Sequence, residues 1–74
     1  MLMVNINKLR GKIVERGLTV YELANLIGID KATLYRKFSK NGETLTIKDA
    51  DSIIIALDLN SEETKAIFFA QFVA

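Results

Sequence analysis

The sequence predicts an all-α protein, a compact single domain of five helices. Hydrophobic residues recur three and four positions apart in several segments, which is the spacing of one helix face. Proline is absent and only four glycines occur, so few positions interrupt a helix. Thr, Asp, Asn or Ser stands where each helix should begin. Because 74 residues, half of them hydrophobic, suffice for a single core, we expect one domain over residues 1–74.

The first helix is expected from about Asn5 to Arg16. Ile6, Leu9 and Ile13 form one apolar stripe, and Gly17 ends the helix. Four cations lie on the other faces of this helix: Lys8, Arg10, Lys12 and Arg16. Two interpretations stay open for each of them, an exposed ion pair of little energetic weight or a contact with phosphate.

Residues 19–38 predict two short helices joined by a tight turn. Thr19 and Glu22 have the spacing of a capping box at the start of the first helix. Gly28 ends that helix, because glycine adopts the left-handed conformation at no steric cost, and Asp30 starts the next helix. The apolar faces of the two helices consist of Leu23, Leu26 and Ile27, followed by Leu34 and Phe38. The segment is therefore predicted to be a helix-turn-helix.

The second helix of this pair leaves one face available for a partner. At 100° per residue, Ala32, Arg36 and Lys40 lie opposite Leu34 and Phe38. Thr33, Tyr35 and Ser39 flank that face.

A fourth helix should follow a loop at residues 39–45 that turns at Asn41 and Gly42. Thr46 and Asp49 again have capping-box spacing. Its expected core face consists of Ile47, Ala50, Ile53, Ile54 and Leu57. Ile55 points away from this face and should be exposed.

The last helix, from about 61 to 73 with Asn60 or Ser61 as its cap, has more apolar residues than one stripe can hold. They are Ile67, Phe68, Phe69, Phe72 and Val73. Either this helix is wedged deep in the core or it presents apolar surface to a second chain. We favour the second interpretation, because one core accepts only one face of a helix. The expected partner interface consists of Ile55, Phe68, Phe69, Phe72 and Val73.

Charge is distributed unevenly along the chain, although the net charge is only +1. Residues 1–40 contain eight Lys or Arg and three carboxylates, a balance of +5, and residues 41–74 contain two Lys and six carboxylates, a balance of −4. A basic half that carries the helix pair is what a protein facing phosphates would have.

Composition also limits the chemistry. The chain has no cysteine and no histidine, which removes thiolate metal sites, disulfides and the usual zinc ligands and general base. No nucleophile is paired with a base at a recognisable spacing, so we expect no enzyme activity, metal or cofactor. No apolar stretch has the length of a signal peptide or a membrane span, so a soluble, cytoplasmic protein is expected.

The segment TVYELANLIGIDKATLYR resembles the helix-turn-helix of the Cro and lambda-repressor-like family of DNA-binding proteins. Ala24, Gly28, Ile29 and Leu34 match its pattern, and the helical patterns before and after extend the similarity over nearly the whole chain. The resemblance implies the lambda-repressor-like fold, with the second motif helix in the DNA major groove and the first helix crossing the backbone.

Carried onto this chain, the resemblance implies two sets of DNA contacts. Lys31 and Arg36 would donate to guanine, Ala32 and Thr33 would touch a thymine methyl group, and Tyr35 would contact a base or a phosphate. Tyr35 could instead pack on Lys31 or on the first helix. The phosphate contacts would be Thr19, Val20, Lys37 and Lys40. The expected protein is thus a small Cro-like regulator of a bacterium or its phage, acting on double-stranded DNA as a homodimer joined through its last helix.

Val20 and Tyr21 depart from the family pattern, which usually has polar residues at both positions. Valine offers a phosphate only its backbone N–H. The apolar and aromatic pair supports an alternative, a module of the same fold that binds another regulator, such as a phage repressor, and reads DNA weakly. An apolar C-terminal segment and a net charge near zero favour the same alternative.

Overall fold

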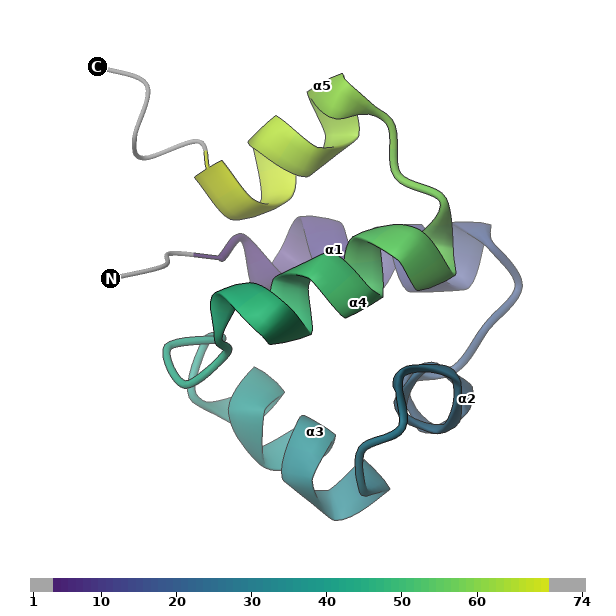
Figure 1. Ribbon diagram of the computed structural model, residues 1–74, viewed down its shortest axis with the longest axis vertical. Helices are drawn as coiled ribbons and strands as arrows, with labels where there is room; N and C mark the ends of the chain where they lie inside the picture. Colours follow the sequence, from purple (N-terminus) through teal and green to yellow (C-terminus); the bar gives the residue numbers. More distant parts are fainter. Residues whose placement is uncertain (1–3, 70–74) are drawn as a thin grey trace.

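The computed structural model describes residues 4–69. Within that range the chain forms α1 (Ile6–Glu15), α2 (Val20–Ile27), α3 (Lys31–Ser39), α4 (Ile47–Leu57) and α5 (Ser61–Thr64), and a π-helical turn, η1 (Lys65–Phe69), continues α5. The described residues contain no strand, so the all-α prediction is confirmed. Figure 1 shows α3 and α5 at opposite ends of the long axis, with α1 and α4 between them and α2 beside α3. None of the described helices is long and apolar enough to cross a membrane.

The caps that the sequence predicts for α2, α3 and α4 are present, and Asn5 caps α1. Thr19 Oγ1 accepts a hydrogen bond from the Glu22 N–H at 3.1 Å, and Glu22 Oε1 accepts from the Thr19 N–H at 3.0 Å. Thr46 and Asp49 form the same reciprocal pair, and Asn60 caps α5 with Glu63 as its partner. These caps satisfy N–H groups that have no acceptor inside a helix.

The loop between α3 and α4 packs closely on the start of the chain. Asn41 and Gly42 both have positive φ, 56° and 74°, which confirms the predicted turn. A Cβ atom added to Gly42 would lie 2.9 Å from Val4 Cβ, so a side chain at this position would force the segments apart.

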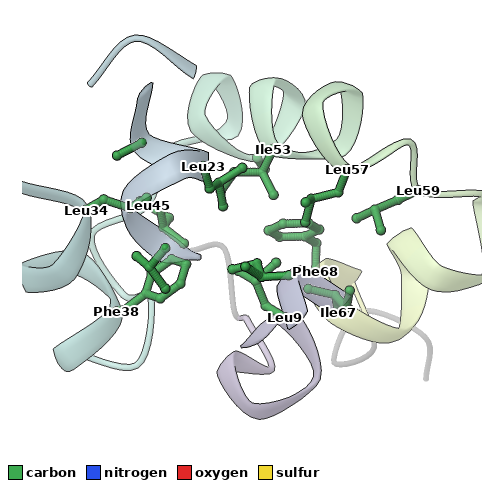
Figure 2. Packing of buried hydrophobic residues seen from close by; sticks show 14 residues of the cluster. Leu9, Leu23, Leu34, Phe38, Leu45, Ile53, Leu57, Leu59, Ile67 and Phe68 are labelled. Atoms are coloured by element: carbon green, nitrogen blue, oxygen red, sulfur yellow. The ribbon is translucent and has the colours of Figure 1, made fainter. Parts of the chain in front are cut away.

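The core collects side chains from α1 to α4, from η1 and from the two loops that flank α4. In Figure 2 the Phe68 ring lies among Leu9, Leu57 and Ile67, and Phe38 lies on the α3 side. The buried hydrophobic residues are Leu9, Ile13, Val20, Leu23, Ala24, Leu34, Phe38, Leu45, Ala50, Ile53, Leu57, Leu59, Ile67 and Phe68.

Two residues that the sequence places on a core face are exposed in the structure. Leu26 is 61% exposed and Ile47 is 73% exposed. On α2 the inward direction is set by Val20, Leu23 and Ala24, and Leu26 lies more than a quarter turn away from it. Ile47 is the first residue of α4, ahead of the turns that pack on the core.

The last helix differs from its prediction in one respect that matters for function. Ile67 and Phe68 are 2% and 0% exposed, so the expectation that Phe68 faces a second chain is wrong and this part of the helix is wedged into the core. A π-helical turn contains more residues than an α-helical one, so the angle between successive side chains is smaller and Ile67 and Phe68 point in closer directions. The Asn5 N–H donates to the Ile67 carbonyl at 2.7 Å and ties this turn to the start of α1. The Phe69 side chain, Phe72 and Val73 lie outside the described residues.

Candidate nucleic-acid interface

The turn between α2 and α3 fixes the direction in which α3 projects. Gly28 has φ of 76°, as predicted, and the Ile29 N–H donates to the Ala24 carbonyl at 3.1 Å. The Asp30 carboxylate caps α3 by accepting from the Ala32 N–H at 3.0 Å. Because Leu34 and Phe38 are buried, the opposite side of α3 must face outward.

That outward side contains most of the residues expected to read DNA. Arg36 and Lys40, four positions apart, are both exposed, and neither charged group has an ion pair or hydrogen bond with the described part of the chain. Ala32 and Tyr35 are exposed beside them, and Thr33 is half-buried. These residues therefore share the outward side of one helix, and the guanidinium group of Arg36 is available to a ligand.

Lys31 is held by a neighbouring side chain. Its Nζ donates to Tyr21 Oη at 3.0 Å and lies 4.2 Å from the centre of the Tyr21 ring. The hydrogen bond from Lys31 to Tyr21 raises the pKa of Lys31 above its ordinary value. The hydrogen-bond partner of Lys31 is thus Tyr21 of α2, a contact that the sequence did not indicate.

Lys37, expected to contact phosphate, is engaged within the protein. Its Nζ lies 2.6 Å from Asp49 Oδ2 on α4. Burial of the Asp49 carboxyl opposes ionisation, but hydrogen bonds from Lys37 and from the Thr46 N–H outweigh it and lower the pKa of Asp49. Lys37 therefore joins α3 to α4, with its charge already balanced.

The start of α2 offers backbone groups and one hydroxyl. The Val20 side chain is buried, and Thr19 Oγ1 accepts from the Glu22 N–H, which leaves the Thr19 O–H able to donate to a phosphate. The first N–H groups of a helix have no acceptor within the helix, and they attract anions. Any phosphate contact of Val20 must therefore come from its N–H.

Two cations at the end of α1, Lys12 and Arg16, are turned toward α5. Lys12 forms ion pairs with Glu15 at 2.9 Å and with Glu63, and Arg16 NH2 lies 3.4 Å from Glu63 Oε1. Arg16 Nε also donates to the Leu57 carbonyl at 2.9 Å. The Asn60 N–H and Lys12 together lower the pKa of Glu63 to about 2. For Lys12 and Arg16 the ion-pair interpretation is the one that fits the structure.

The other two α1 cations differ from these. The Arg10 guanidinium lies 5.3 Å from the centre of the Phe38 ring and covers the core side of α3. Lys8 is exposed.

Among the described residues no three His, Cys, Asp or Glu side chains come together as metal ligands would.

Comparison with known proteins agrees with this geometry. The family model of the Cro/C1-type HTH DNA-binding domain matches residues 8–63, a range that contains α1 to α4 almost entirely and reaches into α5. Searches of curated proteins and of solved structures gave no match. The matched range covers well over half of the chain and includes the turn and the outward face of α3. The chain therefore belongs to the family of Cro/C1-type helix-turn-helix DNA-binding domains.

Proposed function

We propose that this protein is a sequence-specific transcription regulator of bacterial or phage type that inserts α3 into the major groove of double-stranded DNA. The observation that carries the proposal is the exposed face of α3, where Arg36 and Lys40 have no acidic partner among the described residues. Family membership supports the same use of the face. The protein would act in the cytoplasm, where bacterial DNA lies, and by binding rather than by catalysis.

The roles of the residues follow from their positions. Arg36 extends a planar fork that suits O6 and N7 of guanine, and Lys31 at the start of α3 would donate to the same two atoms of a second guanine. Ala32 and Thr33 would touch a thymine methyl group, and Tyr35 a base or phosphate. Lys40 and the N–H groups after Thr19 would hold phosphates. Lys37 contributes less, because Asp49 already balances its charge.

We also propose that the regulator binds as a homodimer, since a two-fold pair of recognition helices reads two half-sites. Ile55, which is 77% exposed on α4, supports an apolar contact between chains. Phe69, Phe72 and Val73 would complete that contact. Sedimentation equilibrium of the protein and of Ile55→Asp tests it. The dimer of the variant should dissociate at a higher protein concentration than the dimer of the parent. A parent protein that is monomeric at micromolar concentration would refute the dimer.

The test of DNA binding is fluorescence anisotropy with labelled duplexes. The protein is first used to select sequences from a random duplex library, and one selected duplex is then compared with a scrambled one at 50 and 200 mM salt. We expect selective binding that weakens by roughly a thousandfold over this range if six or more phosphates are contacted. Weak binding without preference for the selected duplex would refute the proposal.

A second candidate function rests on an apolar hollow between α2 and α4. It has a volume of about 290 Å³ and is lined by Leu26, Ile27, Ser52, Ile55 and Ala56. A module that binds another regulator, such as a phage repressor, would use this surface in place of α3. Leu26→Glu should abolish such binding and leave DNA affinity nearly unchanged, whereas Arg36→Ala should do the reverse. A pull-down with the candidate repressor and the anisotropy assay together distinguish the two functions.

A further inference from the structure

The contact between Tyr21 and Lys31 joins the first turns of the two motif helices. Tyr21 is the second residue of α2 and Lys31 is the first residue of α3. The 3.0 Å hydrogen bond and the 4.2 Å distance from Nζ to the ring centre place the ammonium group against both the hydroxyl and the ring. Tyr21 is 48% exposed, so the pair lies at the surface that α2 and α3 share.

Tyr21 is a rigid anchor for a flexible partner. The capping box of Thr19 and Glu22 fixes the first turn of α2, and Val20 and Leu23 on either side of Tyr21 are buried. A tyrosine has only two side-chain dihedral angles. A lysine has a flexible four-carbon chain and loses much more rotamer entropy when it is held in place. The contact therefore restricts Lys31 far more than it restricts Tyr21.

We propose that Tyr21 is a positioning residue that holds the Lys31 ammonium group at the start of α3, so that Lys31 recognises guanine instead of binding phosphate indiscriminately. This inference rests on the proposed function, in which α3 reads the major groove. It gives a role in DNA reading to a residue that the sequence singles out as a departure from the family pattern.

The hydrogen-bonding capacity of the two groups fits this role. An ammonium group has three donors and no acceptor, and Tyr21 Oη takes one donor. Two donors remain, which is the number that O6 and N7 of guanine can accept. An unrestrained lysine is a mobile point charge that is drawn to the nearest phosphate, and such contacts carry no sequence information. Tyr21 would thus turn a general attraction into discrimination at one base pair.

The experiment is a double-mutant cycle on the selected duplex and on each of its single base-pair substitutions. The variants are Tyr21→Phe, which keeps the ring and removes the hydroxyl, Lys31→Met, and the two combined. We expect Lys31→Met to identify its base pair by loss of discrimination there. Tyr21→Phe should reduce discrimination at that same base pair by about three- to tenfold, the effect of one hydrogen bond. Discrimination at the base pair that depends on Arg36 should stay at the parental level.

The cycle separates positioning from a direct contact of Tyr21 with DNA. In the Lys31→Met background Tyr21→Phe should have no further effect on discrimination. An equal loss of affinity on every duplex, or an effect that persists without Lys31, would overturn the inference and leave the proposed function standing. A gain in discrimination in Tyr21→Phe would also overturn it, because Tyr21 would then be withholding Lys31 from DNA. A parent protein without any sequence preference would overturn the proposed function and this inference together.

A measurement without DNA checks the contact itself. Protons that lie over an aromatic ring are shifted in the NMR spectrum, so the ε-methylene protons of Lys31 should show a ring-current shift in the parent. Tyr21→Leu should abolish that shift. An unchanged Lys31 resonance in Tyr21→Leu would contradict the anchoring role.

Discussion

The two ends of the molecule use the same kind of side chain in opposite ways. At the α3 end, Arg36 and Lys40 project outward without acidic partners among the described residues. At the α5 end, Lys12 and Arg16 converge on Glu63. All four cations come from the basic half of the sequence. The difference teaches that the charge balance of a segment does not say which charges can meet a ligand, because tertiary pairing decides that.

The largest expected effect concerns the assignment of the α5 end to the core. Phe68→Ala should lower the free energy of unfolding by about 3–5 kcal/mol, because it empties a fully buried aromatic site. Urea denaturation followed by circular dichroism measures this. The control is Val14→Ala, where an exposed side chain outside the proposed dimer interface should cost less than about 0.5 kcal/mol. A loss below about 1 kcal/mol for Phe68→Ala would show that this end is an appendage and would break the comparison.

The second effect concerns Arg36, the unpaired cation at the α3 end. Arg36→Ala should cost about 1–3 kcal/mol of discrimination at one base pair, which is roughly ten- to a hundredfold in relative affinity. The matched control is Lys12→Ala, whose charge is engaged with Glu63 and should leave selectivity unchanged. Anisotropy on single-substituted duplexes measures both. Equal losses in the two variants would mean that α1 and α3 contribute alike to DNA contact.

The fold was predictable where local chemistry determines it. The caps at Thr19, Asp30 and Thr46 and the turn at Gly28 depend on residues within a few positions of each other, and all of them are confirmed. The exposed positions of Leu26 and Ile47 were not predictable in the same way, because the inward direction of a short helix depends on its neighbours. The burial of Phe68 was not predictable for a related reason, because the expectation assumed a regular α-helix with a single core face and residues 65–69 form a π-helical turn.

In the candidate site, too, features that depend on nearby residues could be predicted, whereas contacts between distant residues could not. The outward direction of Arg36 follows from the burial of Leu34, two positions away, and could be derived from the sequence. The contacts of Lys37 with Asp49 and of Lys12 with Glu63 join residues 12 and 51 positions apart, and their spacing carries no signal. The contact of Lys31 with Tyr21 crosses the turn of the motif, so it depends on the angle between α2 and α3.

A smaller effect should distinguish the two ends by their response to salt. Lys40→Ala should weaken binding to all duplexes alike and reduce the slope of log K against log salt by about 1, the value for one phosphate contact. Lys65→Ala, which removes an exposed cation at the α5 end, should leave the slope unchanged. The measurement is an anisotropy titration at four or more salt concentrations. Equal reductions in both slopes would mean that the α5 end also faces DNA.

The smallest effect concerns Glu63, on which Lys12 and Arg16 converge. The pKa of Glu63 is lowered to about 2 in the folded protein, against an ordinary value of 4.5. Between these values the unfolded chain binds more protons than the folded one, so stability rises with pH. The contribution of Glu63 is therefore complete above about pH 4.5 and is lost as pH falls toward 2.

Glu63→Gln should accordingly be less stable than the parent at pH 7, by a small amount because the ion pairs are in contact with water. The gap between the two proteins should close as the pH falls from 4.5 to 2, as measured by urea denaturation across that range. The control is Glu62→Gln, an exposed neighbour with no ion pair in the described residues, which should be about as stable as the parent at pH 7. A gap that stays constant with pH would mean that the ionised form of Glu63 adds no stability, neither through the Asn60 N–H nor through Lys12 and Arg16. The ion pairs at the α5 end would then hold nothing together, and the contrast with the unpaired cations of α3 would lose its energetic basis.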